Sequence, residues 1–323
     1  MRRRALLLTI LLGVALVPAT GSAQRARPYR IGAVTENWGP SPQVVGLRDG
    51  LGALGYRENQ DFVLGVRFTS GDFGALPGAV RDFIQQGVDV LVAGSGSGLT
   101  VARDATSSTP ILFISGGDPV AQGVIRSYAK PGGNVTGVTS EELELTPKRL
   151  EIFQAAVPGM KRILYVHDAT NPYSPREADA YRAAARRLGI TLTVKPARTR
   201  EEVVAVFAQL RKGDTQGFVS PFAVTLNIPG VMIETANRLS LPTMFGDRVY
   251  VELGGFASYG PDLYASGRQA ARLREKIMRG ANPGDIPVEV NNRVELALNA
   301  KVARALKITV PPDVAVLVNR LIE

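Results

Sequence analysis

Apolar, β-branched runs alternate with helix-like segments along the first 120 residues of the chain. The apolar runs are continuous instead of alternating with polar residues, and the connections are too long for hairpins. Both features are typical of a parallel sheet that is covered by helices on both faces. The predicted strands are residues 29–34, 62–68, 88–93 and 111–115, and the predicted helices between them are residues 42–54 and 76–86.

The same alternation repeats in the second half of the chain. It predicts helices at 146–156, 175–188, 201–210 and 226–239, and strands at 162–166, 190–195, 217–220 and 242–246. Gly189 directly follows one helix, as expected for a left-handed residue that ends it. The sequence therefore predicts two doubly wound α/β lobes, both Rossmann-like and of similar size.

The last 70 residues are predicted to complete these lobes and not to form a third. They contain a short strand with glycines at both ends (254–260), a long helix (262–278), an extended segment (286–290) and a helix at 297–306. Because these pieces are too small for a separate core, we expect the chain to cross between the lobes more than once.

The N-terminus has a different composition. Three arginines precede an apolar core from Ala5 to Val17, and Gly21 and Ala23 lie at −3 and −1 of a cleavage site before Gln24. This predicts a secretory signal peptide over residues 1–23. The alternative is an uncleaved anchor, but the apolar run is shorter than the roughly 20 residues that span a bilayer. The chain has no cysteine, so we expect no lipid anchor and a soluble protein in the periplasm.

Charge and composition exclude several kinds of function. The net charge is +9, but the basic residues are scattered and form no run with aromatic spacing, so we expect no nucleic-acid partner. With one histidine, His167, and no cysteine, a His/Cys metal site is excluded and so is most nucleophilic catalysis. Glu141, Glu142 and Glu144 are interpreted as a solvated acidic loop before a helix that begins at Thr146. We expect no enzyme, no metal and no cofactor.

Ligands of doubly wound sheets bind beyond the carboxyl ends of the strands, so the residues there are the candidate site. Ser95 and Ser97 open a helix, where they either bind a carboxylate or simply cap the helix. Asp118 either binds an ammonium group or fixes its turn, and Trp38 either stacks on a ligand or packs. The stretch 94–100 departs from a dinucleotide fingerprint at Leu99. The predicted ligand-binding residues are Trp38, Ser95, Gly96, Ser97, Gly117, Asp118, Pro119, Asn171, Phe222, Phe245 and Tyr259.

Several motifs resemble a family of substrate-binding proteins of ABC transporters that includes tryptophan- and tyrosine-type members. They are residues 55–60 (GYRENQ), 118–120 (DPV), 130–137 (KPGGNVTG), 259–262 (YGPD), 276–280, 286–289 and 303–308, in order through nearly all of the mature chain. The resemblance implies a type I periplasmic binding protein fold with three crossovers. It implies one lobe from 28–137 plus 254–281 and another from 138–253 plus 282–323, hinged near Gly132 and Gly133. The chain departs from the family at residues 95–97 and 167–168, so the family's aromatic amino acids do not carry over as ligand.

The resemblance also implies a function. The expected protein is a monomeric periplasmic solute-binding component of an ABC importer, which binds a small, amino-acid-like molecule between its lobes and meets an ABC permease in the inner membrane. Two alternatives stay open from the sequence. One is an exported sensing module that reports its ligand to a membrane receptor, and the other is an exported Rossmann-like enzyme.

Overall fold

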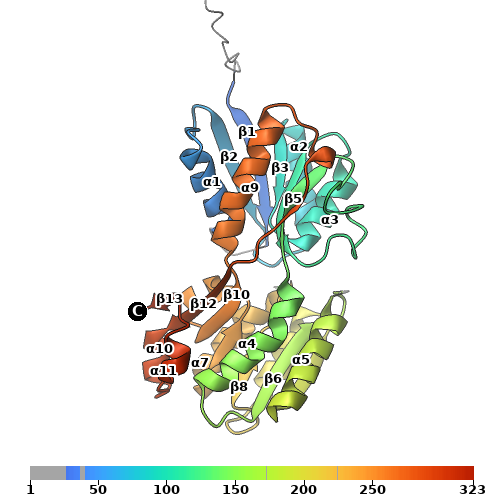
Figure 1. Ribbon diagram of the computed structural model, residues 1–323. Helices are drawn as coiled ribbons and strands as arrows, with labels where there is room; N and C mark the ends of the chain where they lie inside the picture. Colours follow the sequence, from blue (N-terminus) through green and yellow to red (C-terminus); the bar gives the residue numbers. More distant parts are fainter. Residues whose placement is uncertain (1–26, 37–40, 172, 224) are drawn as a thin grey trace, which may run out of the picture.

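The computed structural model describes residues 27–36, 41–171, 173–223 and 225–323. The predicted signal peptide, residues 1–23, and the candidate residue Trp38 lie outside the described residues. Figure 1 shows two lobes, one above the other, with the C-terminus on the lower lobe.

Most strands begin within three residues of the predicted positions. The strands of the first sheet are β1 (Tyr29–Thr35), β2 (Phe62–Phe68), β3 (Val90–Ala93), β4 (Ile111–Gly116), β5 (Val135–Ser140) and β11 (Glu289–Val290). The strands of the second sheet are β6 (Arg162–Asp168), β7 (Thr191–Ala197), β8 (Gly217–Val219), β9 (Thr243–Phe245), β10 (Ala257–Pro261), β12 (Val294–Asn299) and β13 (Arg320–Ile322).

Helices cover both faces of each sheet. The α-helices are α1 (Pro42–Ala53), α2 (Leu76–Gln85), α3 (Gly96–Ala105), α4 (Glu142–Ala156), α5 (Ser174–Leu188), α6 (Arg200–Ala208), α7 (Ile228–Leu239), α8 (Val249–Glu252), α9 (Leu263–Met278), α10 (Ala300–Ala305) and α11 (Pro312–Ala315). Single 3₁₀ turns are η1 (Thr225–Asn227) and η2 (Pro283–Asp285).

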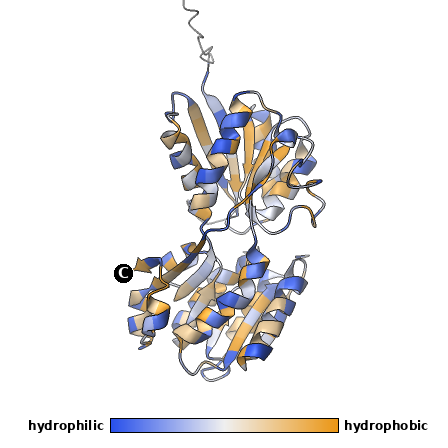
Figure 2. Ribbon diagram, viewed as in Figure 1, coloured by the Kyte–Doolittle hydropathy of each residue, from blue (hydrophilic) through white to orange (hydrophobic). Residues whose placement is uncertain are grey.

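The first sheet has the order β11-β5-β4-β3-β1-β2, and these neighbours are parallel. Side chains of a strand alternate between its faces, which explains the continuous apolar runs. Val90 and Val92 of β3 pack into one core cluster with α1 and α9, whereas Leu91 and Ala93 pack into another with α2 and α3. Figure 2 shows these strands as apolar bands between mixed helices.

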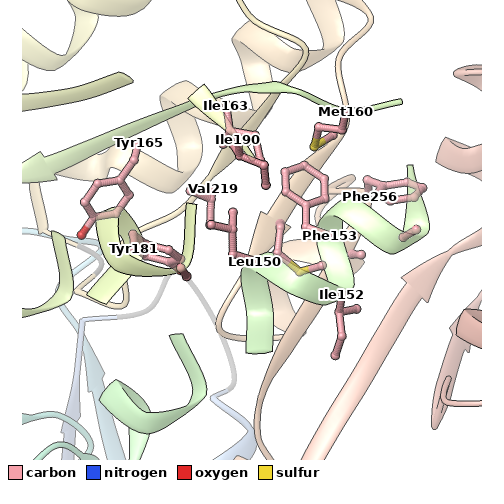
Figure 3. Close-up of a cluster of buried hydrophobic side chains, with 14 of the residues drawn as sticks. Leu150, Ile152, Phe153, Met160, Ile163, Tyr165, Tyr181, Ile190, Val219 and Phe256 are labelled. Atoms are coloured by element: carbon pink, nitrogen blue, oxygen red, sulfur yellow. The ribbon is translucent and has the colours of Figure 1, made fainter. Parts of the chain in front are cut away.

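The second sheet has the order β13-β12-β10-β9-β8-β6-β7. Its neighbours are parallel except β10 and β12, which are antiparallel. One face packs against α4 and α5 in a cluster that includes Phe153, Tyr165 and Tyr181 (Figure 3). The opposite face packs against α6 and α7. The predicted α/β class with two doubly wound lobes is confirmed.

Within the described part of the chain, the polypeptide passes between the sheets three times. The passages run from β5 to α4, from β10 to α9, and from β11 to β12. Two expected boundaries were wrong. The segment assigned to the first lobe, 254–281, includes β10, which pairs with β9 and β12 of the second sheet. The segment assigned to the second lobe, 282–323, includes β11, which pairs with β5 of the first. An apolar run in the sequence predicts that a strand forms. It does not predict which neighbouring strand it pairs with, because that pairing joins residues far apart in the chain.

Two further predictions about local structure were wrong. The predicted helix 297–306 is the end of strand β12 followed by the shorter α10. Helix α4 begins at Glu142 and not at Thr146, so Pro147 lies inside the helix and Glu142 occupies its first turn. Glu142 is buried, which excludes the solvated loop expected for it.

Candidate functional site

The two lobes touch where the carboxyl ends of their strands meet, and we call this region the interlobe face. Gly116 ends β4 of the first lobe, and an added Cβ there would collide with Glu142 Cγ and lie 2.8 Å from Phe222 Cζ. The Tyr173 hydroxyl, from the second lobe, donates to the Asp118 carbonyl oxygen at 3.3 Å. Glycine at position 116 is therefore required by the close approach of the second lobe.

In the first lobe, three elements converge on Glu36 at the end of β1. Ser95, the N-cap of α3, accepts from the Gly98 N–H at 2.9 Å and donates its hydroxyl to Glu36 Oε1 at 2.6 Å. Gln43 of α1 donates Nε2 to the Gly94 carbonyl at 3.1 Å. Burial raises the pKa of Glu36, and the Ser95 hydrogen bond offsets part of that rise.

In the second lobe, the loop from β9 to α8 carries Asp247 and Arg248, and Tyr250 follows within α8. Together with Pro42 and Tyr264 of the first lobe, Asp247 and Arg248 line a small recess between the lobes. Burial raises the pKa of Asp247 to about 6. The hydrogen bond that its carboxylate accepts from the Val249 N–H opposes this rise. Arg248 forms ion pairs of 3.2 Å with both Glu252 and Glu295.

Behind this loop lies a fully buried arginine, Arg149 of α4. It donates to the Tyr259 carbonyl at 2.7 Å, to the Tyr181 hydroxyl at 3.2 Å and to Glu142 Oε2 at 3.1 Å. Glu177 lies 3.8 Å from the same guanidinium. Burial raises the pKa of Glu142 to about 8, because desolvation outweighs the attraction of Arg149. We call Arg149, Glu142, Glu177 and Tyr181 the Arg149 network.

The Arg149 network reaches both the crossovers and the interlobe face. Glu142 directly follows the first crossover, and Tyr259, whose carbonyl accepts from Arg149, precedes the second. Glu177 accepts from the Phe222 N–H at 3.0 Å and so fixes the residue whose ring faces Gly116. The network therefore sets where the second lobe meets the first.

Some predicted site residues do lie together at this face. Ser95, Gly96 and Ser97 open α3 beside Glu36. A Cβ added at Gly96 would lie 3.8 Å from the side-chain oxygen of Gln122. Gly117 and Pro119 lie in the turn after β4, next to Tyr173 of the second lobe, and Phe222 lies beside Gly116 at the end of β4. Whether these residues touch a ligand stays a prediction.

Other predicted residues have different surroundings. The Asp118 carboxylate accepts from the N–H groups of Val120 and Ala121, at 3.0 and 3.1 Å, so it fixes its own turn. Asn171 likewise accepts from the Tyr173 N–H. Phe245 is fully buried in the core of the second lobe, where it stacks on Tyr250. Tyr259 packs against the α4–α5 cluster.

Sequence reasoning missed Glu36, Gln43, Tyr173 and Tyr250. Glu36 directly follows the first strand. The expectation that ligands bind beyond the carboxyl ends of strands, which selected Ser95, therefore applied to Glu36 as well. Tyr250 follows strand β9 by five residues, and no periodic signal in the sequence predicts where its hydroxyl lies. The Arg149 network was invisible because its charges lie one helical turn or more apart and look like an exposed face.

Two features are absent from the described residues. No group of three or more His, Cys, Asp or Glu side chains among them is placed to hold a metal ion. None of the helices in the ranges given above is long and apolar enough to cross a bilayer.

The family model for "ABC transporter substrate binding protein" matches residues 33–322. The chain belongs to this family. The predicted resemblance is thereby confirmed over nearly the whole chain, and the family is one of substrate-binding proteins that act outside the cytoplasm, not one of enzymes.

Relatives of known structure share the architecture. A protein from Vibrio cholerae is 24% identical with a TM-score of 0.76, covering 91% of this chain and 100% of that one. An ABC domain from Streptococcus pneumonia, solved in complex with L-Trp, is 22% identical with a TM-score of 0.77 and the same coverage. These matches establish the type I periplasmic binding protein fold.

A curated relative is named for its ligand. The tyrosine-binding protein of Clostridioides difficile (strain R20291) is 26% identical over 253 residues, which cover 78% of this chain and 72% of the relative.

Proposed function

We propose that this substrate-binding protein serves an ABC importer in the periplasm, that its two lobes close around a small solute, and that the loaded form delivers the solute to a permease in the inner membrane. The observation that carries the proposal is the contact between lobes at Gly116, Glu142 and Phe222. Ligands of such sheets bind at the carboxyl ends of the strands, and here those ends face one another across the two lobes.

Amino acids are the ligand class that this proposal favours. The relatives are a tyrosine-binding protein and a domain solved with L-Trp. The first turn of α3, at Gly96 and Ser97, offers backbone N–H groups that suit a carboxylate. The interlobe face adds aromatic rings from Tyr173 and Phe222, which suit an apolar side chain.

Thermal unfolding of the protein against a panel of amino acids, small peptides, carboxylates, sugars and nucleotides tests the proposal. A ligand present at 100 times its Kd adds about 2.7 kcal/mol to the free energy of unfolding, which raises the Tm by several degrees. A selective rise with one amino acid supports the proposal. Failure of every solute to raise the Tm, or chemical turnover of the solute that binds, contradicts it.

A variant at Gly116 tests whether the ligand binds between the lobes. In Gly116→Ala the added methyl group collides with Glu142 and Phe222 and keeps the lobes apart. We expect its Kd, measured by calorimetry, to rise at least about tenfold, since a closing contact is lost. Gly52→Ala is the control, because a Cβ at position 52 meets no atom within 4 Å. An unchanged Kd in Gly116→Ala would contradict binding between the lobes.

A further inference from the structure

Buried oxygen atoms without partners gather at one part of the interlobe face. Gln43 Oε1, the Ser41 hydroxyl and the Tyr250 hydroxyl have no hydrogen-bond partner within the described residues. The exposed fractions of Gln43, Ser41 and Tyr250 are 4%, 0% and 4%. Unpaired buried polar atoms are costly, so a cluster of them indicates that something else completes their hydrogen bonds.

Gln43 and Glu36 both contact the segment that follows β3, Gln43 through the Gly94 carbonyl and Glu36 through the Ser95 hydroxyl. The point where a Cβ of Gly94 would lie is 3.3 Å from Thr35 Cβ and 3.5 Å from Gln43 Nε2, so the ends of β1 and β3 meet the start of α1 there. On the second lobe, Tyr250 belongs to α8, which directly follows Asp247 and Arg248. Its neighbours Asp247 and Arg248 line the same recess as Pro42, which precedes Gln43.

The carboxylate and amide oxygens of this cluster can only accept, whereas its hydroxyls can donate as well as accept. Gln43 Oε1 is only an acceptor, and the Ser95 hydroxyl already gives its proton to Glu36. Glu36 is 3% exposed, and among the described residues no arginine or lysine is within 4.0 Å of it. The nearby Arg248 is engaged by Glu252 and Glu295. The cluster therefore lacks a hydrogen-bond donor that carries positive charge.

We infer that Glu36, Gln43 and Tyr250 bind the ammonium group of the ligand, so that the solute class is restricted to primary amines, including amino acids. The ammonium group would donate to the Glu36 carboxylate and to Gln43 Oε1 on the first lobe, and to the Tyr250 oxygen on the second. A single group would then draw the two lobes together. The inference rests on the proposed function and specifies the ligand chemistry of that site.

Matched sets of solutes separate the ammonium group from the rest of the ligand. The probes are L-tyrosine, L-tryptophan and L-leucine. Each is accompanied by the amine without the carboxylate (tyramine, tryptamine, 3-methylbutylamine) and by the acid without the amine (3-(4-hydroxyphenyl)propionate, indole-3-propionate, 4-methylpentanoate). Ribose and glucose complete the set. Calorimetric titration of the protein should find binding only among solutes that carry an amine.

Two variants connect that selectivity to named side chains. Glu36→Gln keeps the size of the side chain and an acceptor for Ser95, and should weaken the amine that binds best by about 10- to 100-fold, the range for a hydrogen bond between charged groups. Tyr250→Phe retains the ring that stacks on Phe245, and the affinity for the same amine should fall by a few-fold. Glu144→Gln, which removes an exposed carboxylate, is the control and should bind as the unmodified protein does.

The outcomes distinguish this inference from the proposed function. Binding of a deaminated acid or a sugar as tight as that of the matching amine overturns the ammonium site but leaves solute binding intact. Equal loss of affinity in Glu36→Gln for an amine and its deaminated partner also overturns it, because the variant then acts through folding. If no solute of any kind binds, both proposals fail.

Discussion

Among the residues that the structure describes, each lobe buries one arginine completely, and the two lie at opposite ends of their lobes. Arg149 of the second lobe lies directly behind the interlobe face and donates to the Tyr259 carbonyl and to the side chains of Tyr181 and Glu142. Arg274 of the first lobe stacks its guanidinium 4.4 Å from the centroid of Tyr29, at the start of β1 and far from the strand ends. Behind its side of the interlobe face, the second lobe thus has an ionic network. The first lobe has glycines, serines and the Glu36 carboxylate on its side.

The helices that cover the two sheets differ in the same way. Helices α1 and α9 of the first lobe approach so closely that a Cβ at Gly46 would collide with the Tyr264 carbonyl, and one at Gly267 with the Gln43 carbonyl. In the second lobe, α4 and α5 pack through large side chains such as Phe153 and Tyr181 (Figure 3). The comparison indicates that the first lobe depends on backbone proximity and the second on buried charge and aromatic volume.

The largest expected effect comes from removing the buried charge of the second lobe. Arg149→Met leaves Glu142 and Glu177 buried without their cation, and the free energy of unfolding should fall by about 3–5 kcal/mol. Urea denaturation measures the loss. Lys148→Met, one position earlier on α4, removes an exposed ion pair and should change it by less than about 1 kcal/mol. Equal effects of the two substitutions would contradict a structural role for the Arg149 network.

A smaller effect is expected from the glycine packing of the first lobe. Gly46→Ala forces α1 away from α9 and should lower the free energy of unfolding by about 1–3 kcal/mol. Gly52→Ala lies on the same helix with no atom within 4 Å of its added Cβ, and should raise it by about 0.5–1 kcal/mol. The same denaturation assay compares them. A stabilising Gly46→Ala would show that the helices do not need this close approach.

The smallest effect is a difference in pH dependence. Because the pKa of Asp247 is raised to about 6 in the folded protein, the folded state holds more protons than the unfolded state between about pH 4 and 6. Asp247 therefore makes stability fall as the pH rises through this window. In Asp247→Asn, which retains an acceptor for the Val249 N–H, the Tm relative to that of the unmodified protein should rise as the pH rises from 4 to 7. An identical slope in both proteins would contradict the raised pKa.

Local pattern predicted the lobes and most of their strands, because a buried parallel strand is a continuous apolar run. It could not predict which sheet β10 joins, since that depends on the pairing of Ala257 with Met244 and Leu298. Among the residues of the interlobe face, Ser95 and Phe222 were predicted because each follows a strand of its sheet. Sequence reasoning left open whether Asp118 binds an ammonium group or fixes its turn, and it mistook Glu142 for an exposed carboxylate. Hydrogen bonds within a turn and burial by residues distant in sequence leave no local pattern.

The three passages between the sheets also constrain the order in which the chain can fold. Helix α9 covers the first sheet with Ala270, Leu273 and Ile277, and β11 completes its edge near residue 290. A chain emerging from its N-terminus thus holds the first five strands of the first lobe for about 120 residues, from Ser140 to Leu263, before the helix that shields them begins. Contacts so distant in sequence slow folding. The first lobe therefore cannot complete its packing until residues 263–290 are available.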